Sequence, residues 1–90
     1  MPINIYEEDT FKKIANLSSD KWDLPNQLDD FEVWLKTEGV KLQKSIYVAD
    51  IGFDIRKNAN GGGAIINLEM IKILAQIGME IYLSEYPNQI

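Results

Sequence analysis

The sequence predicts a single α+β domain over residues 1–90, a small two-layer sandwich in which a mixed β-sheet of about 3–4 strands packs against helices. Three observations carry this prediction. Ser45 to Ile55 alternates in the two-residue period of a strand. Asn67 to Tyr86 reads as a capped apolar helix that passes through one glycine into another strand. Apolar residues at helical spacing between Leu28 and Leu35 predict a further helix.

The N-terminal third predicts a short strand followed by an amphipathic helix. Ile3 to Tyr6 has the apolar alternation of a brief strand. Three acidic residues, 7–9, suit the positive end of a helix dipole. From there, helical spacing continues until two serines, and the apolar positions are Phe11, Ile14, Ala15 and Leu17. A short segment around Trp22 and Leu24 then ends at Pro25, because proline disfavours helical geometry in the residue before it.

The middle helix is predicted from about Asn26 or Gln27 to Glu38, ending at Gly39. Leu28, Phe31 and Leu35 share its core-facing side. Trp34 lies at the edge of that side, either as a lid on the core or as an interface anchor. Val33 points away from the core among acidic residues, so this helix is the predicted recognition surface. Its partner-binding residues are Asp29, Asp30, Glu32, Val33, Trp34 and Glu38.

The C-terminal half predicts strand, loop, helix and strand. Arg56 to Gly63 is a loop, because its asparagines and glycines are costly to hold in a strand. Asn67 caps the following helix, whose polar stripe is so narrow that we expect it to be largely buried on the sheet. Gly78 ends the helix and Met79 to Tyr86 forms the last strand. The helical crossover favours a partly parallel sheet.

Charge is negative overall and unevenly distributed. The chain has a net charge of −5; residues 1–38 contain nine acidic and four basic residues, whereas residues 39–90 contain five of each. Such a field repels phosphate backbones and steers basic partners, so direct nucleic-acid binding is disfavoured. The simpler interpretation is an acidic, solvated surface that keeps the protein soluble.

The residue types argue against an enzyme. The chain contains no histidine and no cysteine, so no serine has the usual base and no zinc site or disulfide is expected. Asp50 and Asp54 share a strand face about 13 Å apart, too far for one metal ion. Gly61 to Gly63 lacks the lysine and hydroxyl residue of a phosphate-binding loop, and only Arg56 and Lys57 are cations nearby. We predict no catalytic residue, metal or cofactor.

No targeting segment or membrane-spanning stretch is visible. The N-terminus lacks a basic segment followed by an apolar run, and no stretch approaches the roughly 20 apolar residues that a membrane helix needs. A cytoplasmic protein without membrane contact is therefore expected.

The run from Ile46 to Tyr86, with its strand, glycine-rich loop and segment IINLEMIKILAQIGMEIYLSEY, resembles the C-terminal part of a bacterial family of domains of unknown function numbered 4279. Trp22 stands where that family has a tryptophan ahead of its middle helix. This chain departs from the family in a shorter N-terminal half without a clear opening hairpin. Some members resemble small immunity proteins, so the resemblance implies a binding protein that has no catalytic residues.

The leading hypothesis is an immunity protein that binds and occludes a basic toxin, particularly a nuclease, as a monomer or weak homo-oligomer. One alternative is a phage or plasmid inhibitor of the anti-CRISPR or anti-restriction type, which mimics nucleic acid and would need two acidic rows spaced like phosphates. Another is a structural homo-oligomer that pairs through a free edge of the Ser45 to Ile55 strand. An enzyme would need an enclosed pocket with convergent polar groups.

Overall fold

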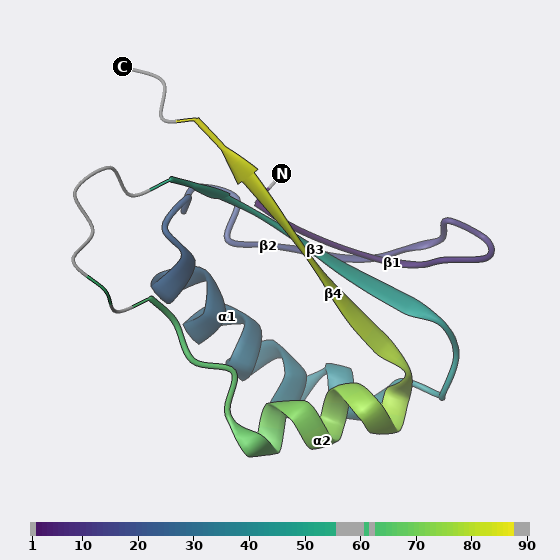
Figure 1. The fold of residues 1–90 in the computed structure, drawn as a ribbon. Coiled ribbons are helices and arrows are strands. Elements are labelled where there is room, and N and C mark those ends of the chain that lie inside the picture. The colour runs from purple at the N-terminus through teal and green to yellow at the C-terminus, as the bar shows by residue number, and fades with distance from the viewer. Residues whose placement is uncertain (1, 56–60, 62, 88–90) are drawn as a thin grey trace.

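The computed structural model describes residues 2–55, 61 and 63–87, which form one four-stranded sheet and a helical layer. In space the strands follow the order β2-β1-β3-β4. The first three are antiparallel neighbours, and β3 and β4 are parallel. Both helices cover the same face of this sheet (Figure 1), so the predicted two-layer α+β sandwich is confirmed. In chain order the elements are β1 (Ile3–Glu7), β2 (Lys13–Leu17), α1 (Leu24–Thr37), the short 3-10 helix η1 (Gly39–Lys41), β3 (Tyr47–Asp54), α2 (Leu68–Ile77) and β4 (Met79–Tyr86).

The N-terminal segment corrects one prediction: the helix expected after Tyr6 is instead the second arm of a β-hairpin. The Glu7 amide donates to the Lys12 carbonyl at 2.9 Å, and Phe11 adopts a left-handed φ of 55° in the turn. The short apolar run fits both the 3.6-residue period of a helix and the two-residue period of a strand. Pairing decided the outcome, because β1 is buried between β2 and β3 and a helix would leave its backbone groups unpaired on one side. The opening hairpin that the sequence did not reveal is therefore present.

Helix α1 exists as predicted but begins earlier. The predicted glycine cap at Gly39 is wrong, because Glu38 is the C-cap and Gly39 starts the short helix η1 without a positive φ. Asp23 caps it, accepting from the Asn26 amide at 3.3 Å. Pro25 lies in the first turn, where a missing N–H is not needed by the helix. The sequence interpretation treated this proline only as a stop signal. The predicted core-facing residues Leu28 and Phe31 are 5% and 0% exposed, as expected for the buried side.

Strand β3 lies within the predicted Ser45 to Ile55 segment and is paired on both sides. The expectation that this strand offers a free edge is therefore wrong. The last strand is parallel to β3, which confirms the crossover prediction. Among the described residues 2–55, 61 and 63–87, no strand pairs with the outer sides of β2 and β4, which are therefore the free edges of the sheet.

Both predicted caps of α2 are confirmed, but the prediction that this helix is largely buried is wrong. Asn67 accepts from the Met70 amide at 3.0 Å, and Gly78 ends the helix with φ 84°. Leu68 and Ile71 are 66% and 50% exposed, so α2 is buried only where it faces the sheet and α1 (Figure 1), rather than around nearly its whole circumference. The reason is geometric: one helix on a sheet with a second helix beside it has only two covered sides.

The core lies between the sheet and the two helices. Fully buried residues come from both layers, and the largest are Phe31, Ile3, Ile5, Leu35, Ile51, Met70 and Ile77. Most of the predicted Arg56 to Gly63 loop, including Arg56 and Lys57, lies outside the described residues. None of the helices in the described ranges is long and apolar enough to cross a membrane.

Candidate functional site

The predicted recognition residues all come from α1 and its C-terminal end, yet they lie on different sides of the helix. Asp30 points toward the segment between β2 and α1, Glu32 points toward the start of α2, and Trp34 folds back on the core. Asp29 and Val33 are exposed. The 100° step between successive helical residues makes this dispersion unavoidable for adjacent acids.

Asp30 is held by two partners from the segment before α1. Its carboxylate accepts from the Ser18 hydroxyl at 2.6 Å and from the Lys21 ammonium at 3.1 Å. The Ser18 hydrogen bond, and then Lys21, hold the pKa of Asp30 below its ordinary value. In return Asp30 raises the pKa of Lys21. These contacts of Asp30 hold the segment between β2 and α1 against the helix.

Glu32 joins α1 to the beginning of α2. It accepts from the Asn67 side-chain amide at 2.9 Å and pairs with Lys36 at 2.7 Å, one turn along the helix. Lys36 also reaches Glu69 at 3.2 Å. The hydrogen bonds from Lys36 and then Asn67 lower the pKa of Glu32. Asn67 thus caps α2 with its oxygen while its nitrogen binds α1, which ties the two helices together.

Asp29 and Val33 are the two predicted residues that face solvent. Val33 is 63% exposed. Within the described part of the chain, the Asp29 carboxylate makes no ion pair or hydrogen bond. A carboxylate and an isopropyl group one turn apart, both unengaged, are available to a partner.

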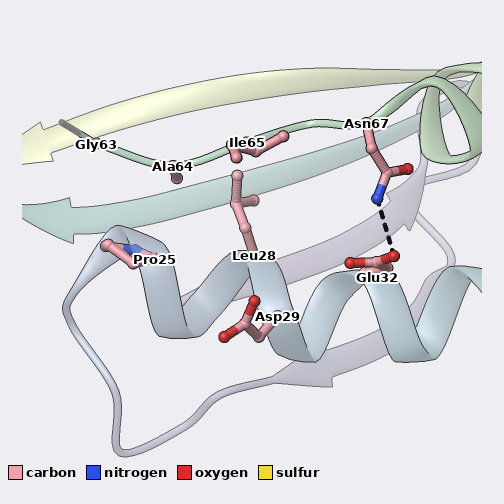
Figure 2. Close-up of a pocket in the computed structure, with 8 residues that line it drawn as sticks. All are labelled: Pro25, Leu28, Asp29, Glu32, Gly63, Ala64, Ile65 and Asn67. Carbon is pink, nitrogen blue, oxygen red and sulfur yellow. Dashed lines mark hydrogen bonds between the residues drawn. The ribbon is translucent and has the colours of Figure 1, made fainter.

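A groove of about 320 Å³ runs beside α1, between the helix and the segment that leads into α2. Figure 2 shows Leu28 pointing from α1 toward Ile65, with Asp29 and Glu32 along the helix and Asn67 at one end. Ile65 is 79% exposed, so the apolar wall is open to solvent. The groove combines carboxylate acceptors with apolar side chains, a lining that suits a basic and partly apolar segment. Its lining residues are Pro25, Leu28, Asp29, Glu32, Gly63, Ala64, Ile65 and Asn67.

Trp34 and Glu38 lie away from this groove. The Trp34 ring stacks on Phe31 with centroids 6.3 Å apart and an interplanar angle of 8°. A β-carbon added at Gly39 would lie 2.9 Å from the Trp34 ring, so the glycine leaves room for the indole. The half-buried Trp34 packs against the core, in the geometry of a lid. Glu38 is exposed and approaches Lys41 at 3.8 Å.

Sequence reasoning missed the groove residues that follow the glycine run. Asn67 was predicted only as a helix cap, and no role was predicted for Ile65. An exposed isoleucine beside consecutive glycines was the available signal, because a loop has no general need for a large apolar side chain.

No protein-family model matches the chain, and no curated protein and no solved structure matches it. Among the described residues, no group of three or more His, Cys, Asp or Glu side chains is arranged to hold a metal ion.

Proposed function

We propose that this protein is a binding module that inhibits a basic protein partner, with the groove beside α1 as its contact surface. The observation that carries the proposal is the groove itself, which is lined by the unpaired Asp29 carboxylate and by the exposed side chain of Ile65, while the exposed Val33 lies one turn of α1 beyond Asp29. Interfaces obtain affinity from buried apolar anchors and obtain steering and register from complementary charge. The net charge of −5 adds a long-range attraction for a basic surface.

The form of inhibition proposed is occlusion, as in an immunity protein that covers a toxin, and the resemblance noted in the sequence supports this choice. A nuclease is the suggested toxin class, because its active site attracts phosphate and therefore also attracts carboxylates. Glu32 also contributes indirectly, since its hydrogen bond from Asn67 joins the two walls of the groove, whereas Asp30 fixes α1 to the segment that precedes it.

The test compares two charge reversals that change net charge equally. Asp29→Lys places a cation in the groove, whereas Asp9→Lys places it in the exposed hairpin turn. Both are attached to a resin, exposed to lysate of the source cell at low and high salt, and compared with the unchanged protein by mass spectrometry. We expect a stoichiometric basic partner that leaves at high salt, and a loss of affinity of about tenfold or more for Asp29→Lys alone.

Activity is then tested with the captured protein. Its expression alone should arrest growth, and co-expression of the unchanged chain should relieve the arrest while Asp29→Lys should not. Equal capture by the two variants would remove the groove from the proposal. A captured partner that is harmless to the cell would remove the inhibitor function.

A further inference from the structure

The free edge of β4 is the second surface of interest, and it lacks the protection that β2 has. Strand β2 has five residues, includes Lys13 and has an irregular register against β1. Strand β4 has eight residues in an unbroken register with β3 and contains no lysine or arginine. Charged side chains, lysine above all, bulges and short length are the usual means by which proteins prevent an edge strand from pairing further. Of these, strand β4 has only its two glutamates, Glu80 and Glu85, which repel an acidic strand and attract a basic one.

The hydrogen bonds to β3 determine which backbone groups point outward. The Tyr47 amide donates to the Gly78 carbonyl at 3.0 Å, and the Ile55 amide donates to the Tyr86 carbonyl at 3.1 Å. In a parallel ladder, residues alternate between directing both backbone groups at the neighbour and directing both away. The even-numbered residues of β4 therefore bond to β3, and the N–H and C=O groups of Ile81, Leu83 and Glu85 point to the free edge.

The two sides of this edge differ in chemistry. On the helix-covered face the edge presents Ile81 and Leu83, with Leu83 58% exposed, and near its end the exposed Glu85. On the opposite face Glu80 and Glu8 lie around Tyr82, whose hydroxyl donates to the Glu8 carboxylate at 3.3 Å. Their negative charges, that of Glu8 first, raise the pKa of Tyr82. In the described part of the chain neither glutamate has a basic partner.

We propose that the free edge of β4 binds an extended segment of a partner protein, in which basic residues alternate with apolar ones, as a fifth strand of the sheet. The apolar side chains of that segment pack beside Ile81 and Leu83, and its basic side chains lie on the face of Glu80 and Glu8. Charge complementarity selects this occupant over a second copy of the chain. Antiparallel self-pairing of β4 would place Glu80 of both copies on one face of the joined strands and Glu85 of both copies on the other face, with no basic residue on either strand. This surface is separate from the groove beside α1, and the inference holds whether or not the protein is an inhibitor.

The test uses two capped octapeptides, one alternating lysine and valine and the other alternating glutamate and valine, titrated into the isotope-labelled full chain. We expect saturable binding of the lysine peptide alone. Bound peptide should slow amide hydrogen exchange at Ile81, Leu83 and Glu85, because these amides become donors to the added strand.

The variant Leu83→Pro removes an outward-facing N–H and leaves the β3 ladder intact, since proline is tolerated at the outer side of an edge strand. Leu83→Ala is the matched control, which removes the same side chain and keeps the N–H. We expect Leu83→Pro to weaken lysine-peptide binding about tenfold beyond Leu83→Ala. If Leu83→Pro does not fold, the test of the proposal is the amide hydrogen exchange of the unchanged protein with the lysine peptide bound.

Four results would overturn the proposal. They are equal binding of both peptides, protection of amides outside the free edge, equal affinity of the two Leu83 variants, and an unliganded dimer in sedimentation whose Ile81, Leu83 and Glu85 amides are already protected. The last result would assign the edge to a second copy.

Discussion

Replacing Gly78 by alanine tests the junction that sets β4 beside β3. Gly78 has φ 84°, and a β-carbon there would lie 2.1 Å from the carbonyl oxygen of Ser45. Two backbone hydrogen bonds hold the Ser45 segment in place. The Ser45 amide donates to the Ile77 carbonyl at 3.1 Å, and the Tyr47 amide donates to the Gly78 carbonyl at 3.0 Å. The clash therefore cannot be relieved by rotation of a side chain.

The expected destabilisation has two parts. A left-handed backbone costs a residue other than glycine about 1 to 2 kcal/mol. Relief of the clash requires movement of two hydrogen-bonded backbone segments, and loss of both bonds costs about 1 kcal/mol each. The sum is about 3 to 4 kcal/mol, which lowers the melting temperature of a domain of this size by roughly 12 to 30 °C.

Gly61→Ala is the matched control, because Gly61 also has positive φ, at 94°, but a β-carbon there meets no atom within 4 Å. Its expected cost is the conformational part alone, about 1 to 2 kcal/mol. Thermal and urea unfolding followed by circular dichroism measure both variants. Equal losses in the two, or a Gly78→Ala melting temperature within a few degrees of the unchanged protein, would refute the close-approach argument.

Two further predictions concern polar groups that position α1. Gln27 is fully buried, and its side-chain amide donates to the carbonyls of Lys21 at 2.9 Å and Gly52 at 2.7 Å. Gln27→Ala leaves both acceptors unpaired and should lower the free energy of unfolding by about 2 to 4 kcal/mol in urea titrations, whereas a change under about 0.5 kcal/mol would contradict this role. Asp30 has a lowered pKa in the folded state, so its contribution to stability is present above its unfolded pKa of about 3.9 and disappears as the pH falls through the folded value. Asp30→Asn should therefore flatten the decline in stability below about pH 4 in urea titrations across pH, and an unchanged decline would exclude Asp30 as its source.

Cap residues and apolar spacing predicted the ends and the buried sides of helices correctly where neighbouring residues determine them. Asn67 and Gly78 mark the two ends of α2, and Leu28 and Phe31 mark the buried side of α1. The same kind of signal was misleading at Pro25, which belongs inside the first turn of α1. Proline is compatible both with the end of an extended segment and with the beginning of a helix, so its neighbours alone do not distinguish the two.

The candidate site was predictable only in part. The sequence places Asp29 and Val33 on the exposed side of α1, and both are exposed. It does not reveal that Asp30 pairs with Lys21. It also does not reveal that Glu32 binds Asn67, because this contact joins residues 35 positions apart. The opposite wall of the groove comes from the segment around Ile65, which reaches α1 only through the path of the chain in the folded domain.

The sequence by itself determined the α+β class, the acidic charge, two helices with the caps of α2, and the strands β1, β3 and β4, because these depend on period, cap residues and composition. The tertiary structure decided that residues 13–17 form a strand, that β3 is central and β4 lies at an edge, and that the acids of α1 divide among three surroundings. The physical reason is that sheet order and ion pairing are settled by partners distant in the chain. Which strand keeps a free edge depends on how the whole domain buries its apolar residues.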